Sequence, residues 1–193
     1  MKGYPMKTQY YTAMSVNGYL ADENNSLDWL FQFGDVESMQ DSYPRFIEQI
    51  GAVAMGSTTY EWVLNHEKLL EHPEKWPYSI PSWVFSTRQL PLVPGADIRL
   101  VQGDVARVHA EMVEAAAGKN IWIAGGGDLV GQFHDHGLLD ELILTVAPVM
   151  LRAGAPLLPR NVVTPPMKLV RVEQHGDVYA VLVYAVQREA GGA

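Results

Sequence analysis

Short apolar runs recur along the chain and predict a sheet. Residues 51–55 and 120–124 are mostly apolar and strand-forming, a pattern typical of strands that are buried on both faces. Strands buried in this way need helices on both sides of the sheet. Further strands are predicted at 7–14, 82–87, 96–101, 140–151, 167–175 and 177–186.

Helices are predicted between several of these strands. Asp104 is placed to cap a helix that carries one apolar stripe and ends at Gly118. Thr58 and Glu61 have the spacing of a capping box, which predicts that a helix begins there. Another helix is predicted at 128–136.

The remaining segments are less regular. Residues 38–50 have a helical pattern, in which Pro44 must lie in the first turn or kink the helix. Residues 15–26 and 64–82 are rich in turn-forming residues, so we expect loops there, the first of them mobile. A tight turn at His175–Gly176 predicts that the last two strands form an antiparallel hairpin.

The order of these elements predicts one α/β domain over residues 1–193. Strands alternating with helices come first and the hairpin comes last, which favours a mixed, mainly parallel sheet. We expect residues 1–6 to be a loose extension and residues 187–193 to be a loose tail.

Composition excludes several classes of function. The formal net charge is −8, with 22 acidic and 14 basic residues and no basic cluster, which disfavours a nucleic-acid partner. No apolar run is long enough to span a bilayer, and the first residues lack the apolar centre of a signal peptide, so we expect a cytoplasmic protein without a membrane partner.

Metal and thiol chemistry have no support in the sequence either. The chain contains no cysteine. His134 and His136 are two residues apart near the end of a predicted helix, so they point to different faces and do not predict a metal site. The sequence also lacks the motifs of zinc hydrolases and of serine hydrolases.

Three consecutive glycines, Gly125 to Gly127, follow the predicted strand at 120–124. One interpretation is a tight turn between a strand and a helix. The other is a phosphate-binding loop, in which free backbone amides and a helix N-terminus face an anion. The segment does not match the dinucleotide fingerprint G-x-G-x-x-G, because Val130 occupies the position of its last glycine.

Two other turns could bind an anion. Residues 56–59 also join a strand to a helix, although the capping-box spacing explains that helix start without a ligand. Arg88 follows another strand, and it is either a phosphate contact or a solvated loop residue. A dinucleotide carries a diphosphate and, in some cases, a 2′-phosphate, so it could use more than one of these turns.

Taken together, these motifs resemble the dihydrofolate reductase superfamily, in the branch similar to the reductase domain of riboflavin biosynthesis. The resemblance extends from about Thr8 to Val186. It rests on the order of the segments YYTAMSVNGYLADENNSLDWL, VAMGSTTYE, VFSTR, IWIAGGGDLVGQF, DELILTVAPVML and AGAPLL.

The resemblance implies a three-layer, dihydrofolate-reductase-like fold with a central sheet of about eight strands, and NADPH bound across its carboxyl edge. It implies a cis peptide bond between Gly125 and Gly126, and a homodimer. Arg88 is implied as the partner of the 2′-phosphate. The cofactor-binding residues that it implies are Ala13, Asn17, Gly18, Gly56, Ser57, Thr58, Thr59, Ser86, Thr87, Arg88, Ala124, Gly125, Gly126, Gly127, Asp128 and Leu129.

The function that follows is an NADPH-dependent reductase of a small heterocyclic substrate, pterin or pyrimidine-like, or of a carbonyl compound. Asp28 is the candidate catalytic proton donor. Asn17 stands where the riboflavin-type motif S-x-D-G has an acid. Two alternatives are a non-catalytic nucleotide or small-ligand-binding protein and an enzyme of sugar phosphates that uses no dinucleotide.

Overall fold

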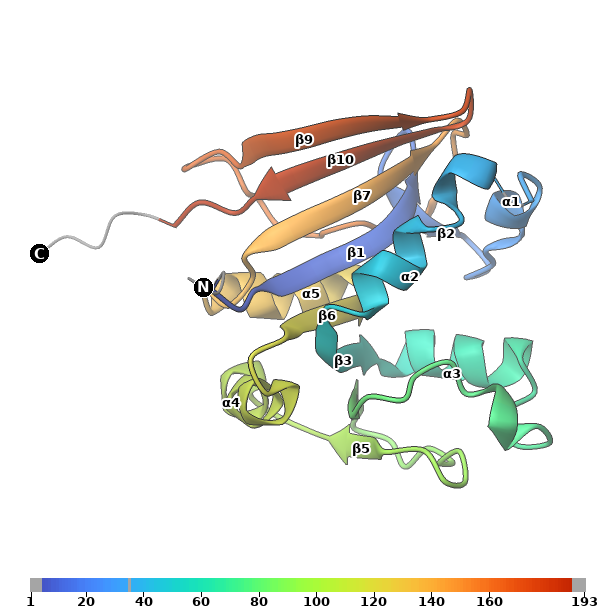
Figure 1. The fold of residues 1–193 in the computed structure, drawn as a ribbon, viewed down its shortest axis with the longest axis vertical. Helices are drawn as coiled ribbons and strands as arrows, with labels where there is room; N and C mark the ends of the chain where they lie inside the picture. Colours follow the sequence, from blue (N-terminus) through green and yellow to red (C-terminus); the bar gives the residue numbers. More distant parts are fainter. Residues whose placement is uncertain (1–4, 35, 189–193) are drawn as a thin grey trace, which may run out of the picture.

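An eight-stranded sheet runs through the molecule in the order β5-β4-β3-β6-β1-β7-β10-β9 (Figure 1). The computed structural model describes residues 5–34 and 36–188. The first six strands of this order are parallel, and β10 pairs antiparallel with both β7 and β9. The strands are β1 (Thr8–Ser15), β3 (Ile50–Gly56), β4 (Ser82–Phe85), β5 (Ile98–Val101), β6 (Asn120–Gly125), β7 (Glu141–Ala147), β9 (Lys168–His175) and β10 (Tyr179–Ala185).

Helices cover both faces of this sheet, as the buried strands predict. Ala52 and Ala54 of β3 pack in one core cluster with helices α4 (Val105–Ala116) and α5 (Gly127–Asp135). The alternate residues Val53 and Met55 pack on the other face, with α2 (Ser42–Ile47) and α3 (Ser57–His66). The predicted mixed, mainly parallel sheet between two helical layers, with a terminal hairpin, is confirmed.

One predicted helix start, and one of the two positions left open for Pro44, are confirmed. Asp104 caps α4, since its carboxylate accepts a hydrogen bond of 2.8 Å from the backbone N–H of Ala106. Pro44 lies in the first turn of α2, where its missing N–H costs no helical hydrogen bond.

Other local predictions are wrong. The helix predicted over 38–50 is divided into the 3₁₀ turn η1 (Glu37–Met39) and α2, because a helix running through Pro44 from residue 38 would lose a backbone hydrogen bond. The capping box is absent: Gly56 is the N-cap of α3, without a side-chain hydrogen bond, and Glu61 pairs with Arg88 instead.

The segment predicted as a mobile loop contains a strand. β2 (Tyr19–Asp22) pairs antiparallel with β8 (Gly154–Pro156) in a second, two-stranded sheet. The last two strands are joined by three residues, 176–178, rather than by a two-residue turn. Between 64 and 82 the chain is irregular beyond the end of α3, apart from the 3₁₀ turn η2 (Pro73–Lys75). A last short helix, α1 (Asp28–Phe31), follows β2.

The ends of the described chain contact the domain. Met6 packs against the core cluster that includes α4 and α5, and the Arg188 guanidinium donates to Asp140 over 2.6 Å. The rest of the predicted loose ends, residues 1–4 and 189–193, lies outside the described residues. Within the described ranges, no helix has the length and apolar character needed to cross a membrane.

Candidate functional site

Two helix N-termini meet at the carboxyl edge of the sheet. Neighbouring parallel strands β3 and β6 end at Gly56 and Gly125; α3 begins directly after Gly56, and α5 begins after one further residue, its N-cap Gly126. A β-carbon added to Gly56 would lie 3.7 Å from the backbone nitrogen of Gly126. The first turn of each helix has N–H groups without helical partners and a partial positive charge. The fold therefore brings together two of the turns that the sequence singles out.

The three glycines differ in what the fold requires of them. Gly125 has a φ of +143°, which favours glycine, and its peptide bond to Gly126 is cis, as the resemblance implies. A β-carbon on Gly127 would lie 2.3 Å from the carbonyl oxygen of Pro156. Gly126 has an ordinary φ of −81°, and a β-carbon there would meet no atom within 4 Å. The packing explains Gly127, but nothing in the protein itself requires Gly126 to be glycine.

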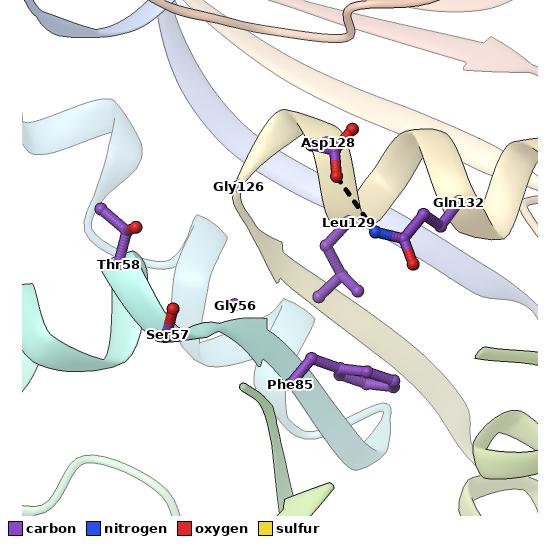
Figure 2. A pocket seen from close by; sticks show the side chains of 8 residues that line it. All are labelled: Gly56, Ser57, Thr58, Phe85, Gly126, Asp128, Leu129 and Gln132. Atoms are coloured by element: carbon purple, nitrogen blue, oxygen red, sulfur yellow. Dashed lines mark hydrogen bonds between the residues drawn. The ribbon is translucent and has the colours of Figure 1, made fainter. Parts of the chain in front are cut away.

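A hollow of about 240 Å³ lies beside Gly126, between the N-termini of α3 and α5 (Figure 2). We call it the anion groove. Backbone amides and hydroxyl groups at two helix starts give it the donors that phosphate groups use in proteins. Its lining residues are Gly56, Ser57, Thr58, Phe85, Gly126, Asp128, Leu129 and Gln132.

A larger hollow of about 380 Å³, the main cavity, continues from the groove and shares Thr58, Gly126 and Asp128 with it. Strands β1, β2, β6 and β8 and helices α1, α3 and α5 contribute residues to it. Its lining comprises Thr12, Ala13, Leu20, Ala21, Asn25, Leu27, Leu30, Thr58, Thr59, Trp62, Ala124, Gly125, Gly126, Gly127, Asp128, Ala155, Pro156 and Pro159.

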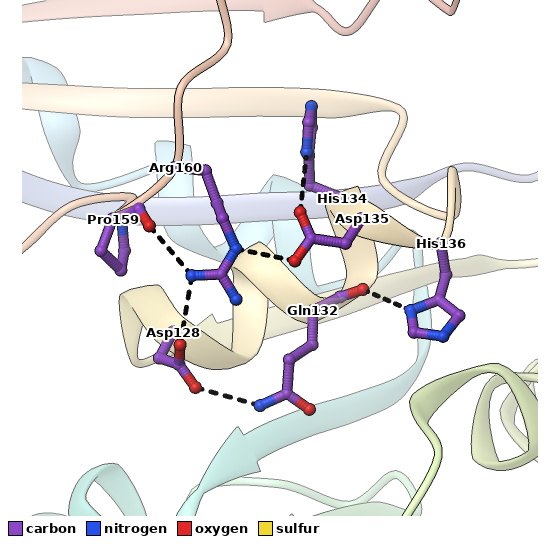
Figure 3. A network of polar contacts seen from close by, with 7 residues as sticks. All are labelled: Asp128, Gln132, His134, Asp135, His136, Pro159 and Arg160. Atoms are coloured by element: carbon purple, nitrogen blue, oxygen red, sulfur yellow. Dashed lines mark hydrogen bonds and ion pairs between the residues drawn. The ribbon is translucent and has the colours of Figure 1, made fainter.

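Arg160, which was not predicted from the sequence, pairs with two carboxylates of α5 (Figure 3). The Arg160 guanidinium donates to Asp128 over 3.2 Å and to Asp135 over 2.7 Å, and it holds the pKa of the Asp135 carboxyl below its usual range. Gln132 donates to the second carboxylate oxygen of Asp128 over 3.0 Å. The sequence feature that could have indicated this contact is a glycine inside the predicted helix, Gly131. A β-carbon on Gly131 would lie 2.6 Å from the guanidinium carbon of Arg160.

Arg88 makes an ion pair within the protein. Its guanidinium donates to both carboxylate oxygens of Glu61 on α3, one of them over 2.9 Å. Its backbone N–H donates to the Ser86 hydroxyl over 2.9 Å. Ser86, Thr87 and Arg88 follow β4, whose last residue, Phe85, lines the anion groove, but they do not line either hollow themselves.

The other predicted site residues divide into two groups. Ala13 and Ala124 line the main cavity. Asn17 instead anchors a turn, because its side-chain amide donates to the carbonyl of Leu151 over 2.7 Å and accepts from the N–H of the same residue over 3.1 Å. Gly18 completes that turn with a φ of +82°. Asp28 is an exposed residue at the start of α1 and is not among the lining residues of either hollow.

Metal ligands are not grouped in the described part of the chain, where no cluster of three or more His, Asp or Glu side chains could hold an ion. His134 lies near the end of α5, and its Nδ1 is 3.6 Å from a carboxylate oxygen of Asp135.

The sheet order, the terminal hairpin and the paired helix starts are those of a dihydrofolate-reductase-like, reductase-type fold. The model of the RibD C-terminal domain family matches residues 7–181, so the chain belongs to this family. Resemblance to the riboflavin-type branch, inferred from the sequence motifs, is thereby confirmed.

Relatives support this membership over most of the chain. The uncharacterized protein YwjB of Bacillus subtilis (strain 168) is 34% identical over 152 residues, which are 78% of this chain and 82% of YwjB. A candidate riboflavin biosynthesis protein from Shewanella sp. PV-4 has a similar structure, with a TM-score of 0.78 and 26% identity, over 95% of this chain and all (100%) of that one.

A more distant structure shares the fold. The diaminohydroxyphosphoribosylaminopyrimidine deaminase/5-amino-6-(5-phosphoribosylamino)uracil reductase of Thermotoga maritima has a TM-score of 0.66 and 14% identity. The match covers 95% of this chain and 57% of the Thermotoga chain. Its name gives that protein a substrate that carries a ribose phosphate.

Proposed function

We propose that this protein is an NADPH-dependent reductase that transfers hydride to a small heterocyclic substrate, pterin or pyrimidine-like, or to a carbonyl compound. The observation that carries the proposal is Gly126, an open glycine between two helix N-termini with no requirement of its own in the fold. A diphosphate is a ligand that such a site fits, because it accepts hydrogen bonds from free amides and is attracted by both helix dipoles.

The proposed cofactor contacts follow the two hollows. Gly125 to Leu129 would hold the diphosphate, and Gly56 to Thr59 would hold phosphate groups of the adenosine half at the start of α3. Bound NADPH would supply the hydride. Ala13 and Ala124 have short side chains and line the main cavity, which leaves room there for a flat ring.

Arg88 is the proposed partner of the 2′-phosphate. In the structure its guanidinium is held by Glu61, so binding NADPH would require a 2′-phosphate to replace that carboxylate or to share the guanidinium with it. The pair is exposed, and exposed ion pairs contribute little stability, so this exchange is energetically accessible.

Proton transfer is proposed to use solvent. Among the described residues that line the main cavity, Asp128 is the one carboxylate, and both of its oxygens already accept hydrogen bonds, from Arg160 and Gln132. The exposed Asp28 lies outside the lining set, so we do not assign the proton transfer to it.

We also propose that the protein acts in the cytoplasm as a homodimer. Strand β9 is at the edge of the large sheet and exposes Leu169, Val170 and Val172, each at 50% or more of its surface. A long edge strand with exposed apolar side chains is usually covered in a functional protein, because it otherwise promotes aggregation. A second copy of the chain is the proposed cover.

Calorimetric titration with NADPH and NADH, followed by a screen of NADPH oxidation against pterins, pyrimidines and carbonyl compounds, tests the proposal. We expect NADPH to bind more tightly than NADH and to be oxidised by at least one member of the panel. Tight NADPH binding without oxidation by any compound would favour the non-catalytic alternative. No binding of either dinucleotide would contradict the proposal.

A further inference from the structure

We infer that the substrate of the main cavity is electrically neutral, a flat ring compound without phosphate or carboxylate groups. The inference rests on the proposed function, because it assigns the anion groove to the cofactor and the main cavity to the reacting ring and the substrate. It concerns the part of the main cavity that lies beyond Gly125 to Gly127. Residues of β2, α1, α3 and β8 line this part.

The surface of this part is mostly apolar. Trp62 contributes an aromatic side chain whose orientation is held by stacking on His66, with ring centroids 4.5 Å apart. A flat aromatic wall and aliphatic side chains favour a ring that has little charge, since burying an unpaired charge costs far more than burying apolar surface. The other apolar residues of this part are Leu20, Ala21, Leu27, Leu30, Ala155, Pro156 and Pro159.

The polar side chains that line the cavity, apart from Asp128, are uncharged: an amide, Asn25, and the hydroxyl groups of Thr12, Thr58 and Thr59. Asn25 lines the cavity with a φ of +57°, in a turn fixed by Asp22, whose carboxylate accepts from the N–H groups of Asn24 and Ser26, each over 2.8 Å. The Asn25 side chain makes no hydrogen bond to the described residues. Because an amide both donates and accepts, it fits the carbonyl and N–H edge of a neutral heterocycle.

Charges around the cavity oppose an anion. Asp128 is the single ionisable side chain among the described lining residues, and it is negative. The nearby Arg160 is engaged by Asp128 and Asp135, and Arg88 is engaged by Glu61. Bound NADPH would add the negative charge of its phosphates next to the same cavity. An anionic substrate would therefore meet like charges, with no cation among the described residues that line the cavity.

This sets the chain apart from the Thermotoga relative, whose named substrate carries a phosphate. A phosphate group in a protein is normally held by arginine, lysine or a helix N-terminus. In this chain the N-termini of α3 and α5 line the main cavity as well as the groove, but the proposed function assigns their free amides to the phosphates of the cofactor. The main cavity therefore favours a compound without the phosphate group that the Thermotoga substrate carries.

Binding of matched neutral and anionic compounds to the NADPH-loaded protein tests the inference. The pairs are 5-amino-6-(ribosylamino)uracil with its 5′-phosphate, and dihydrobiopterin with dihydrofolate, whose glutamate carries two carboxylates. We expect the neutral member of at least one pair to bind at least about tenfold more tightly, a difference of ~1.4 kcal/mol. Equal or tighter binding of the anionic members would overturn the inference, and so would binding of neither member of either pair.

An arginine introduced into the cavity gives the matched control. Asn25→Arg is expected to reduce the discrimination against the anionic members about tenfold, while Asn24→Arg places the same charge on the neighbouring exposed residue, outside the lining set, and is expected to change it little. Failure of NADPH itself to bind would contradict the proposed function. Normal NADPH binding with preference for the phosphorylated or carboxylated compounds would contradict only the neutral-substrate inference.

Discussion

Asp128 places a carboxylate in the first turn of α5, beside the amides that we propose for the diphosphate. A negative side chain stabilises a helix N-terminus, but it repels a bound anion. Arg160 offsets this charge through its contact with Asp128 and is itself held by Asp135. The start of α5 therefore carries an acidic side chain whose charge is offset by a paired arginine.

We expect Arg160→Gln to weaken NADPH binding about tenfold, or ~1.4 kcal/mol, because it leaves the Asp128 charge uncompensated. The double variant Arg160→Gln/Asp128→Asn should recover most of the lost affinity, as calorimetry can measure. Arg107→Gln removes the same charge from an exposed position on α4 and serves as the control. Loss of affinity that the double variant does not recover would contradict the role assigned to Arg160.

His109 predicts a pH dependence of stability. Burial lowers its pKa, and the charge of Asp140 offsets only part of that effect. The unfolded chain then binds a proton near pH 6.5, whereas the folded chain binds it only at lower pH, so stability is full above that value and falls as the pH drops below it. Urea unfolding between pH 7 and 5.5 should show a smaller loss for His109→Gln than for the unchanged protein. Equal losses would contradict this assignment.

The three consecutive glycines, Gly125 to Gly127, indicated an unusual turn or a phosphate-binding loop. The sequence could not show which of them the fold requires and which is left open for a ligand. Gly127 is needed because the backbone of Pro156, nearly thirty residues later, passes close to the start of α5. A contact between residues so far apart leaves no pattern in the local sequence. Arg160 was missed for the same reason, since its partners lie 25 and 32 positions away along the chain.

Strand β8 packs closely against the start of α5, and both line the main cavity. We expect Gly127→Ala to lower the free energy of unfolding by about 1–3 kcal/mol, because its β-carbon would overlap the carbonyl oxygens of Pro156 and Leu157. Gly126→Ala is the matched control, since nothing lies within 4 Å of its β-carbon. Urea denaturation measures both, and equal stabilities would contradict the close approach.

The elements that the sequence predicted best are those with long, distinct patterns. The buried strands β3 and β6 and the amphipathic helix α4 lie where they were expected. The pair β2 and β8 was missed because each strand is three or four residues long and they pair over more than 130 positions. Short strands of this kind depend on tertiary contacts rather than on local periodicity.

The exposed edge of β9 predicts that two copies of the chain form a dimer. We expect light scattering of the purified protein to give twice the chain mass of 21.4 kDa. Val170→Lys and Val172→Lys on that strand should together shift the mass toward that of the monomer, because charges on an exposed edge strand oppose pairing. A dimer that survives both substitutions would place the interface elsewhere.

The overall arrangement was predictable because the order of strands, glycine turns and helices specifies the sheet and brings its functional turns to one edge. The lining of the main cavity was not, because it is assembled from β2, α1 and β8, which are short and far apart in the sequence. The anion groove could thus be inferred from local motifs, whereas the lining of the main cavity required the three-dimensional structure.

The proposed function depends on the open amides at Gly126, which we propose hold the diphosphate of NADPH. Calorimetric titration of Gly126→Val with NADPH tests it most directly, since a β-carbon at this position has free space in the protein alone. We expect at least about a hundredfold loss of affinity, or ~2.7 kcal/mol, with a melting temperature close to that of the unchanged protein. A folded Gly126→Val variant that binds NADPH as tightly as the unchanged protein would contradict the claim.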